Sequence, residues 1–329
     1  MNKQQAVMMV GIPGSGKSWR ARLLKEQSKN NCKIFSSDEY RKIIYGDENC
    51  QDNPEKVFNL LYRDMCEHLK LGFDVIFDAT NVTMKGRMHL LKMINSLHLN
   101  GVEKICWVMN TPAFYCIKND QKRDRTVGHQ VIRKFLLSFQ VPQYFEGWDN
   151  IVFEDISDYY GDKELQQVLT QMNIFNQQNP HHIYSLGQHC ANVHNYFIDK
   201  KDPVRAKAGQ LHDVGKLHTQ HFDEYGIAHY YSHDNLGAYQ VMCHSEWLND
   251  IERKHENFLD ILFYINYHMR AHKDFRNPKA YKKYSQIFGQ QKLDYLLEFA
   301  YADIIASGTH EFHDKIVKEI EGKKNQKCK

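Results

Sequence analysis

Hydrophobic and polar positions follow different patterns in the two halves of this 329-residue chain. In the first half, short apolar runs that suit buried strands are separated by longer stretches with apolar residues at helical spacing. Because buried strands that alternate with helices form parallel sheets, we expect an α/β domain with a parallel sheet. The expected strands are 7–10, 32–35, 74–78, 102–109 and 151–153, and the expected helices are 18–26, 54–71, 84–97, 113–120 and 129–139.

The pattern changes after residue 156. Residues 157–180 are rich in polar side chains and end in Asn179-Pro180, which predicts a linker. Beyond the linker the apolar positions have helical spacing, so we expect an all-α domain over residues 181–329 after the α/β domain of residues 1–156. The expected helices of this second domain are 186–197, 203–217, 235–247, 258–268, 293–307 and 310–321.

Composition excludes some classes of protein. The apolar content of 42% and the charged content of 25% are typical of globular proteins. No apolar run approaches the roughly 20 residues that span a bilayer, and the first expected strand leaves no room for a signal peptide. The eight cysteines include no C-x-x-C pair. We therefore expect a cytoplasmic protein without a membrane partner, whereas the net charge of +3 is too small to indicate nucleic-acid binding and the oligomeric state is not predicted.

A phosphate-binding loop lies between the first expected strand and helix. The octapeptide GIPGSGKS, which begins at Gly11, matches the complete pattern G-x-x-x-x-G-K-[ST]. In such a loop the backbone N–H groups of residues 14–16 surround phosphate oxygens, the lysine reaches the β- and γ-phosphates, and the serine hydroxyl binds Mg²⁺. The residues assigned to ATP and Mg²⁺ are Gly14, Ser15, Gly16, Lys17 and Ser18.

Two carboxylates follow strands that should end at the same edge of the sheet. Asp38 follows the second strand and can act as the general base toward an attacking hydroxyl, and Arg41, one helical turn later, can hold an acceptor phosphate. Alternatively, Asp38 or Ser37 caps the next helix. Asp78 ends the third strand, where a carboxylate supports Mg²⁺, unless it is only a turn residue at the strand end.

A basic segment, Lys122-Arg123-Asp124-Arg125, follows the expected helix over residues 113–120. Arg123 or Arg125 can neutralise charge on the transferring phosphoryl group, although the spacing does not decide between them. The alternative is a solvated basic face without a specific role.

Fifteen of the 19 histidines lie at or after His181, which marks the second half as the metal-binding half. Imidazoles combined with carboxylates suit Mn²⁺, Fe²⁺, Co²⁺ or Ni²⁺, and two ions can share such a set. Lys216 should face the same site and bind phosphate, unless it is a surface lysine, and His182 is a further candidate. The expected metal ligands are His189, His212, Asp213, His233, His268 and Asp303.

Residues 270–284 mix basic and aromatic side chains directly after His268. Cations that contact phosphates and aromatic rings that stack on bases are typical of single-stranded RNA binding. A basic loop without a specific role is the alternative.

These motifs carry two resemblances. Residues 5–155 resemble the 5′-hydroxyl polynucleotide kinase family, through the phosphate loop, Asp38-x-x-Arg41, Asp78, the basic segment and Glu146-Gly147-Trp148-Asp149. Residues 180–315 resemble the HD phosphohydrolase superfamily, and are most similar to members that act on RNA 2′,3′-phosphates. The first resemblance implies ATP and Mg²⁺, with Asp38 as general base, Arg41 on the acceptor phosphate and a basic-segment arginine in the transition state.

Together the resemblances imply an RNA end-healing enzyme. It would phosphorylate 5′-hydroxyl ends and remove 2′,3′-cyclic phosphate or 2′-phosphate, with RNA that carries both ends as its partner. Kinases of small molecules use a similar Asp-x-x-Arg arrangement, so a small-molecule kinase fused to an HD nucleotidase is an alternative. A non-catalytic nucleotide-sensing module is another, and the intact Lys17, Asp38, His212 and Asp213 argue against it.

Overall fold

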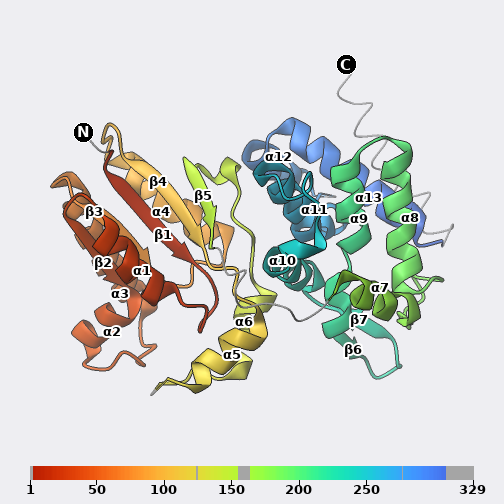
Figure 1. The fold of residues 1–329 in the computed structure, drawn as a ribbon, viewed down its shortest axis with the longest axis horizontal. Coiled ribbons are helices and arrows are strands. Elements are labelled where there is room, and N and C mark those ends of the chain that lie inside the picture. Colours follow the sequence, from red (N-terminus) through yellow and green to blue (C-terminus); the bar gives the residue numbers. More distant parts are fainter. Residues whose placement is uncertain (1–2, 124, 155–163, 276, 309–329) are drawn as a thin grey trace. The chain divides into compact units, whose positions relative to one another are not determined.

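The computed structural model describes residues 3–123, 125–154, 164–275 and 277–308. The chain divides into two compact units, Met1–Tyr159 and Tyr160–Lys329. Figure 1 shows a sheet surrounded by helices in the first unit and an almost entirely helical second unit. Within the described residues, no helix is long and apolar enough to cross a membrane.

The first unit contains one parallel five-stranded sheet in the order β2-β3-β1-β4-β5. Its central strands are buried apolar runs, as parallel strands covered on both faces require. The expected α/β domain with a parallel sheet is confirmed. The strands are β1 (Gln5–Val10), β2 (Cys32–Ser36), β3 (Asp74–Asp78), β4 (Glu103–Val108) and β5 (Asn150–Phe153). The helices are α1 (Lys17–Gln27), α2 (Ser37–Tyr45), α3 (Pro54–Lys70), α4 (Met84–Ser96), α5 (Ala113–Gln121) and α6 (His129–Leu137), with a 3-10 turn η1 (Tyr144–Glu146).

The strand register brings three carboxyl ends together. Asp78 at the end of β3 pairs with Met9 of β1 and with Ser36 of β2. Because β1 continues into the phosphate loop and β2 continues into α2, the residues that follow these strands meet at one sheet edge.

A buried ion pair fixes the loop before β5. Arg87 donates from Nε and Nη2 to the two carboxylate oxygens of Glu146, at 2.7 and 2.6 Å, and both side chains are fully buried. Trp148 also donates its indole N–H to Glu146, at 3.1 Å. The motif Glu146-Gly147-Trp148-Asp149 therefore has a structural contribution here, because removing one partner would leave an unpaired buried charge.

The second unit is built from helices, as expected, with one short hairpin. Its helices are α7 (Leu165–Ile174), α8 (Leu186–Asp199), α9 (Pro203–Leu211), α10 (His233–Cys243), α11 (His255–Lys273), α12 (Pro278–Phe288) and α13 (Gln290–Ala306). The 3-10 segments are η3 (Val214–His218) and η4 (Ser245–Trp247), and the hairpin strands are β6 (Gln220–Phe222) and β7 (Ala228–Tyr230). The helix expected over residues 310–321 lies outside the described residues.

The expected linker is partly wrong. Residues 165–174 form α7, which packs on α8 so closely that a Cβ on Gly187 would lie 2.8 Å from the backbone nitrogen of Asn173. The glutamine-rich composition concealed this helix, in which only Val168 and Met172 are buried. Residues 155–163 of the same stretch lie outside the description.

Candidate functional site

Glycines give the phosphate loop its shape. Gly14 and Gly16 have φ values of +79° and +93°, which side chains other than glycine rarely adopt. A Cβ on Gly14 would also lie 2.1 Å from the carbonyl oxygen of Cys116. Gly16 is the N-cap of α1, so the loop places free backbone N–H groups at a helix N-terminus, where an anion is stabilised.

Neighbouring side chains hold the loop in place. The Thr111 hydroxyl donates to the Ser15 carbonyl at 2.9 Å, and the Asn119 amide donates to the Gly14 carbonyl at 3.1 Å. The Lys17 ammonium donates to the Ile12 carbonyl at 2.8 Å. Burial lowers the pKa of Lys17 to about 8, although the nearby Asp78 carboxylate opposes this shift.

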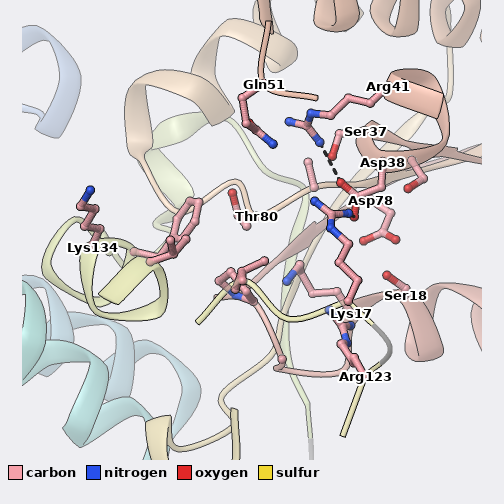
Figure 2. A pocket seen from close by; sticks show the side chains of 18 of the residues that line it. Lys17, Ser18, Ser37, Asp38, Arg41, Gln51, Asp78, Thr80, Arg123 and Lys134 are labelled. Atoms are coloured by element: carbon pink, nitrogen blue, oxygen red, sulfur yellow. Dashed lines mark hydrogen bonds and ion pairs between the residues drawn. The ribbon is translucent and has the colours of Figure 1, made fainter. Parts of the chain in front are cut away.

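A cavity of about 560 Å³ opens at the same sheet edge. Most of the residues predicted for phosphoryl transfer line it, whereas Ser15 and Gly16 of the phosphate loop do not. Figure 2 shows Lys17, Ser18, Asp38, Asp78 and Arg123 around it. The sequence did not indicate Gln51, Phe58, Lys134 and Phe135, which also line the cavity. The predicted residues in the lining are Gly14, Lys17, Ser18, Asp38, Arg41, Asp78, Arg123 and Arg125.

Asp38 lies between two arginines. Its Oδ1 accepts from Arg41 Nη1 at 2.7 Å, and its Oδ2 is 3.4 Å from Arg125 Nη1. The N-cap of α2 is Ser36, and Asp38 lies inside the first turn, so the alternative that Asp38 or Ser37 caps this helix is wrong. The Asp38 side chain is half exposed and faces the cavity.

The segment with the predicted arginines is fixed by a buried carboxylate. Asp120, at the end of α5, accepts hydrogen bonds from the backbone N–H groups of Val127 and Gly128, at 3.1 and 2.9 Å. This contact closes the turn that carries Arg123 and Arg125 between α5 and α6. Arg125 is 3.4 Å from Asp38 and 3.5 Å from Glu48, whereas Arg123 lies nearer Lys17, whose pKa it helps to lower.

Nucleotide binding is expected to take up a proton near Lys17. Because the pKa of Lys17 is about 8 in the free protein, most Lys17 side chains carry a neutral amine at pH 9. The negative phosphates of MgATP should raise this pKa, so that the amine takes up a proton and becomes an ammonium group. Calorimetric titration at pH 9 in two buffers of different ionisation enthalpy should show uptake of most of one proton. At pH 7 the uptake should be near zero, and equal uptake at both pH values would contradict the assignment.

Six side chains from five segments form a buried cluster in the second unit. The carboxylate of Asp213 lies at its centre. Its Oδ2 is 3.4 Å from His189 Nε2 and 3.2 Å from His212 Nε2, and its Oδ1 is 3.0 Å from His233 Nε2 and 3.6 Å from His268 Nε2. Asp213 therefore joins two sets of donors, one on each oxygen.

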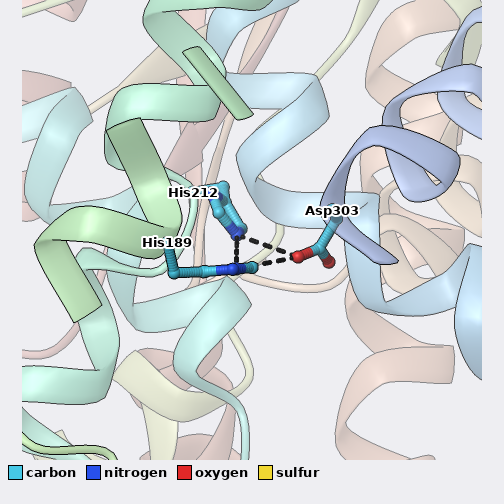
Figure 3. A group of neighbouring side chains, drawn as sticks. All are labelled: His189, His212 and Asp303. Carbon is cyan, nitrogen blue, oxygen red and sulfur yellow. Dashed lines mark hydrogen bonds and ion pairs between the residues drawn. The ribbon is translucent and has the colours of Figure 1, made fainter. Parts of the chain in front are cut away.

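Asp303 completes the first set. Its Oδ1 is 2.9 Å from His189 Nε2 and 3.4 Å from His212 Nε2. Figure 3 shows the three side chains converging from α8, from the residue that follows α9 and from α13. The donor atoms of His189, His212 and Asp303 lie within 4.8 Å of one another, and so do those of Asp213, His233 and His268.

The imidazole orientations suit metal binding. The Nδ1 atoms of His212, His233 and His268 each lie within 3 Å of a backbone carbonyl, to which they can donate. This tautomer leaves the Nε2 lone pairs facing the cluster. His233 Nε2 and His268 Nε2 are 3.2 Å apart, and His189 Nε2 and His212 Nε2 are 3.3 Å apart. Two lone pairs at such distances repel each other unless a proton or a metal ion lies between them, and imidazole nitrogens combined with carboxylate oxygens are donors that fit divalent metal ions.

Without a metal ion, the carboxylates of the cluster favour protons on the imidazole of His212. Burial alone would lower the pKa of His212, but the carboxylates of Asp213 and Asp303 outweigh it and hold the pKa well above its usual range. Burial would raise the pKa of Asp213, but His212 and Lys216 hold it well below its usual range. A metal ion that enters would therefore replace protons on imidazole while the carboxylates are already ionised.

Lys216 is buried beside the cluster, so the alternative of a surface lysine is wrong. Its ammonium is 2.7 Å from Asp213 Oδ2, 3.0 Å from Gln177 Oε1 and 3.3 Å from His182 Nε2. His182 stacks edge-on against His189, and burial together with Lys216 lowers the pKa of His182 to about 2. His182 therefore lies next to the cluster as a neutral imidazole, on the side of Lys216.

One expectation about neighbouring residues needs correction. Phe275 and Tyr284, expected to stack on RNA bases, are 1% and 8% exposed and pack against each other in the core. Arg276 and the side chain of Lys273 lie outside the description. The sequence also did not indicate His272, whose Nε2 is 2.9 Å from Asp303 Oδ2.

Comparison with known proteins supports the assignment of the first unit. A family model described as an AAA domain matches residues 7–142, whereas no curated protein matches the chain. A solved Pnkp1/Rnl/Hen1 RNA repair complex contains a chain that is 22% identical with a TM-score of 0.36, over 50% of this chain and 54% of that one. The APS kinase CysC of Mycobacterium tuberculosis is 18% identical with a TM-score of 0.35, over 47% of this chain and 91% of that one.

The match to the repair complex spans about half the length of that chain. These identities and TM-scores are too low to indicate a substrate or a partner. The family match and the parallel sheet with its phosphate loop agree, however, on the class of the first unit. The N-terminal unit is therefore a P-loop kinase-like domain.

Proposed function

We propose that the chain is a bifunctional RNA end-healing enzyme. The first unit phosphorylates 5′-hydroxyl ends with ATP and Mg²⁺, and the second hydrolyses 2′,3′-cyclic phosphate or 2′-phosphate ends with divalent transition metal ions. The proposal rests on two separate sets of phosphate chemistry in one chain, together with the resemblance of their motifs to polynucleotide kinases and to HD phosphohydrolases.

In the kinase unit, each residue has a role that its position allows. Lys17 and the loop N–H groups hold the β- and γ-phosphates, and Ser18 and Asp78 hold Mg²⁺. Asp38 accepts the proton of the attacking hydroxyl, since it faces the cavity and does not cap its helix. Arg41 binds an acceptor phosphate, and Arg123 or Arg125 stabilises charge on the transferring group.

In the second unit, one metal ion would be held by His189, His212 and Asp303, a second by His233 and His268, and both by Asp213. Metal ions held there would supply Lewis acidity, which polarises a phosphoryl oxygen and lowers the pKa of bound water. Lys216 is placed to bind a phosphate oxygen beside Asp213. The single observation that carries this half of the proposal is the bridging position of Asp213 between the two sets of imidazoles.

The test uses one RNA that carries both ends. With ATP and Mg²⁺, a 5′-hydroxyl RNA that ends in a 2′,3′-cyclic phosphate should gain a labelled 5′-phosphate. With Mn²⁺, Co²⁺ or Ni²⁺, its 3′ end should lose the cyclic phosphate, and Ca²⁺ should support this reaction poorly because imidazole nitrogens disfavour it. High-resolution electrophoresis after enzymatic digestion of the RNA reads both termini.

A control RNA with a 5′-phosphate and a 3′ cis-diol should remain unchanged. Phosphorylation of a small hydroxyl compound together with failure on RNA and DNA 5′ ends would contradict the proposal and favour a small-molecule kinase. Binding of ATP without any transfer would favour a nucleotide-sensing module.

A further inference from the structure

The two buried carboxylates of the cluster are used differently. Both oxygens of Asp213 face imidazoles, and they serve both sets of donors. Asp303 presents only Oδ1 to the imidazoles of His189 and His212. Its Oδ2 points away from them and is 2.9 Å from Nε2 of His272.

Resting on the proposed phosphoesterase function, we infer that His272 is a positioning residue that holds Asp303 as a one-oxygen ligand. An imidazole that donates from Nε2 to Oδ2 fixes the rotation of the carboxylate group. It also occupies the oxygen that would otherwise turn toward the ion. Oδ1 then remains the one atom of Asp303 available to the metal.

The local structure explains why His272 can do this. His268 and His272 are four residues apart on α11, so both side chains lie on one face of the helix. Nε2 of His268 lies 3.6 Å from Oδ1 of Asp213. One helical turn later, Nε2 of His272 lies 2.9 Å from Oδ2 of Asp303 on α13. One helix therefore supplies a ligand to one metal position and an orienting hydrogen bond to the other.

The hydrogen bond is placed where it can be effective. The Asp303 side chain is 11% exposed and that of His272 is 21% exposed, so water competes little for Oδ2. Loss of such a partner behind a metal ligand lowers metal affinity by about 10–100-fold. We expect His272→Ala to have an effect of this size on the ion held by His189, His212 and Asp303. His272→Gln, whose side-chain amide can donate to the same oxygen, should restore most of the affinity.

The experiment is a Co²⁺ titration of the full chain, read by visible absorption of the bound ion and by elemental analysis. Wild type should bind two ions. His272→Ala should bind two ions at saturation, with one of them weakened about 10–100-fold and with a changed absorption spectrum. His229→Ala is the matched control, because His229 also pairs with a carboxylate, that of Asp223 at 2.8 Å in the β6–β7 hairpin, but belongs to neither set of metal donors.

Each outcome decides a different point. If wild type binds no Co²⁺, the proposed function of this unit fails, whatever His272 does. If wild type binds two ions and His272→Ala matches it in affinity and spectrum, His272 has no positioning role. Loss of a whole ion at saturating Co²⁺ would make His272 a ligand instead. Failure of His272→Gln to recover the wild-type spectrum would also overturn the inference.

Discussion

Replacing Asp213 with asparagine is expected to prevent binding of both metal ions and to abolish phosphoesterase activity, while 5′ phosphorylation continues at the wild-type rate. Asp213 is the one residue of the cluster that contacts all four ligand imidazoles, within 3.0–3.6 Å. An amide cannot supply two anionic oxygens, so both donor sets lose a ligand and the shared negative charge. The loss of metal affinity should exceed the roughly 10–100-fold loss that follows removal of a residue that only hydrogen-bonds to a metal ligand.

Elemental analysis of the purified Asp213→Asn protein, with phosphoesterase and kinase assays on the same sample, checks this prediction. Asp223→Asn is the matched control, because Asp223 also pairs with a histidine but lies on the hairpin. Retention of one ion in Asp213→Asn would mean that its two oxygens do not serve two metal positions. Parallel loss of kinase activity would indicate a general folding defect.

The strongest local signals predicted the fold class and two groups of residues that the structure brings together. The octapeptide at Gly11 needs one backbone geometry, and Gly14 and Gly16 adopt the positive φ values that this geometry requires. The spacing of His189, His212, Asp213, His233, His268 and Asp303 predicted residues that the structure brings together. In both cases only a few residue types can bind the expected ligand, a phosphate or a metal ion. The identity and order of these residues along the chain therefore indicate the site before the structure is known.

Other features depend on tertiary packing and could not be predicted. The ring of Tyr284 lies on the buried face of α12, whereas Lys282 and Lys283 on the same helix are exposed. The mixture of basic and aromatic residues, which we interpreted as an RNA-binding segment, is here the pattern of an amphipathic helix. His272 is one turn after His268, but its partner Asp303 is 31 residues away. The sequence shows that His268 and His272 have helical spacing, but it does not indicate that one contacts Asp213 and the other Asp303.

The position of Asp38 between Arg41 and Arg125 allows two explanations of its importance. It can accept a proton from the attacking hydroxyl, or it can merely hold Arg125 in the cavity. The structure supplies a control, because Arg125 Nη1 lies 3.4 Å from Asp38 and 3.5 Å from Glu48. Glu48 does not line the cavity, so Glu48→Gln removes one anchor of Arg125 without removing a possible base.

Asp38→Asn is therefore expected to lower kcat of the kinase by about 10²–10⁴-fold, the range for loss of a general base. The KM for ATP should stay near the wild-type value, because Asp38 belongs to α2 and not to the phosphate loop. Glu48→Gln should lower kcat much less, and Arg125→Gln should lower it by about 10³–10⁵-fold only if Arg125 is the transition-state arginine. Steady-state kinetics with a 5′-hydroxyl RNA measures all three. Equal losses in Asp38→Asn and Glu48→Gln would mean that the carboxylate acts through Arg125, and a proton acceptor would then have to be sought elsewhere in the cavity.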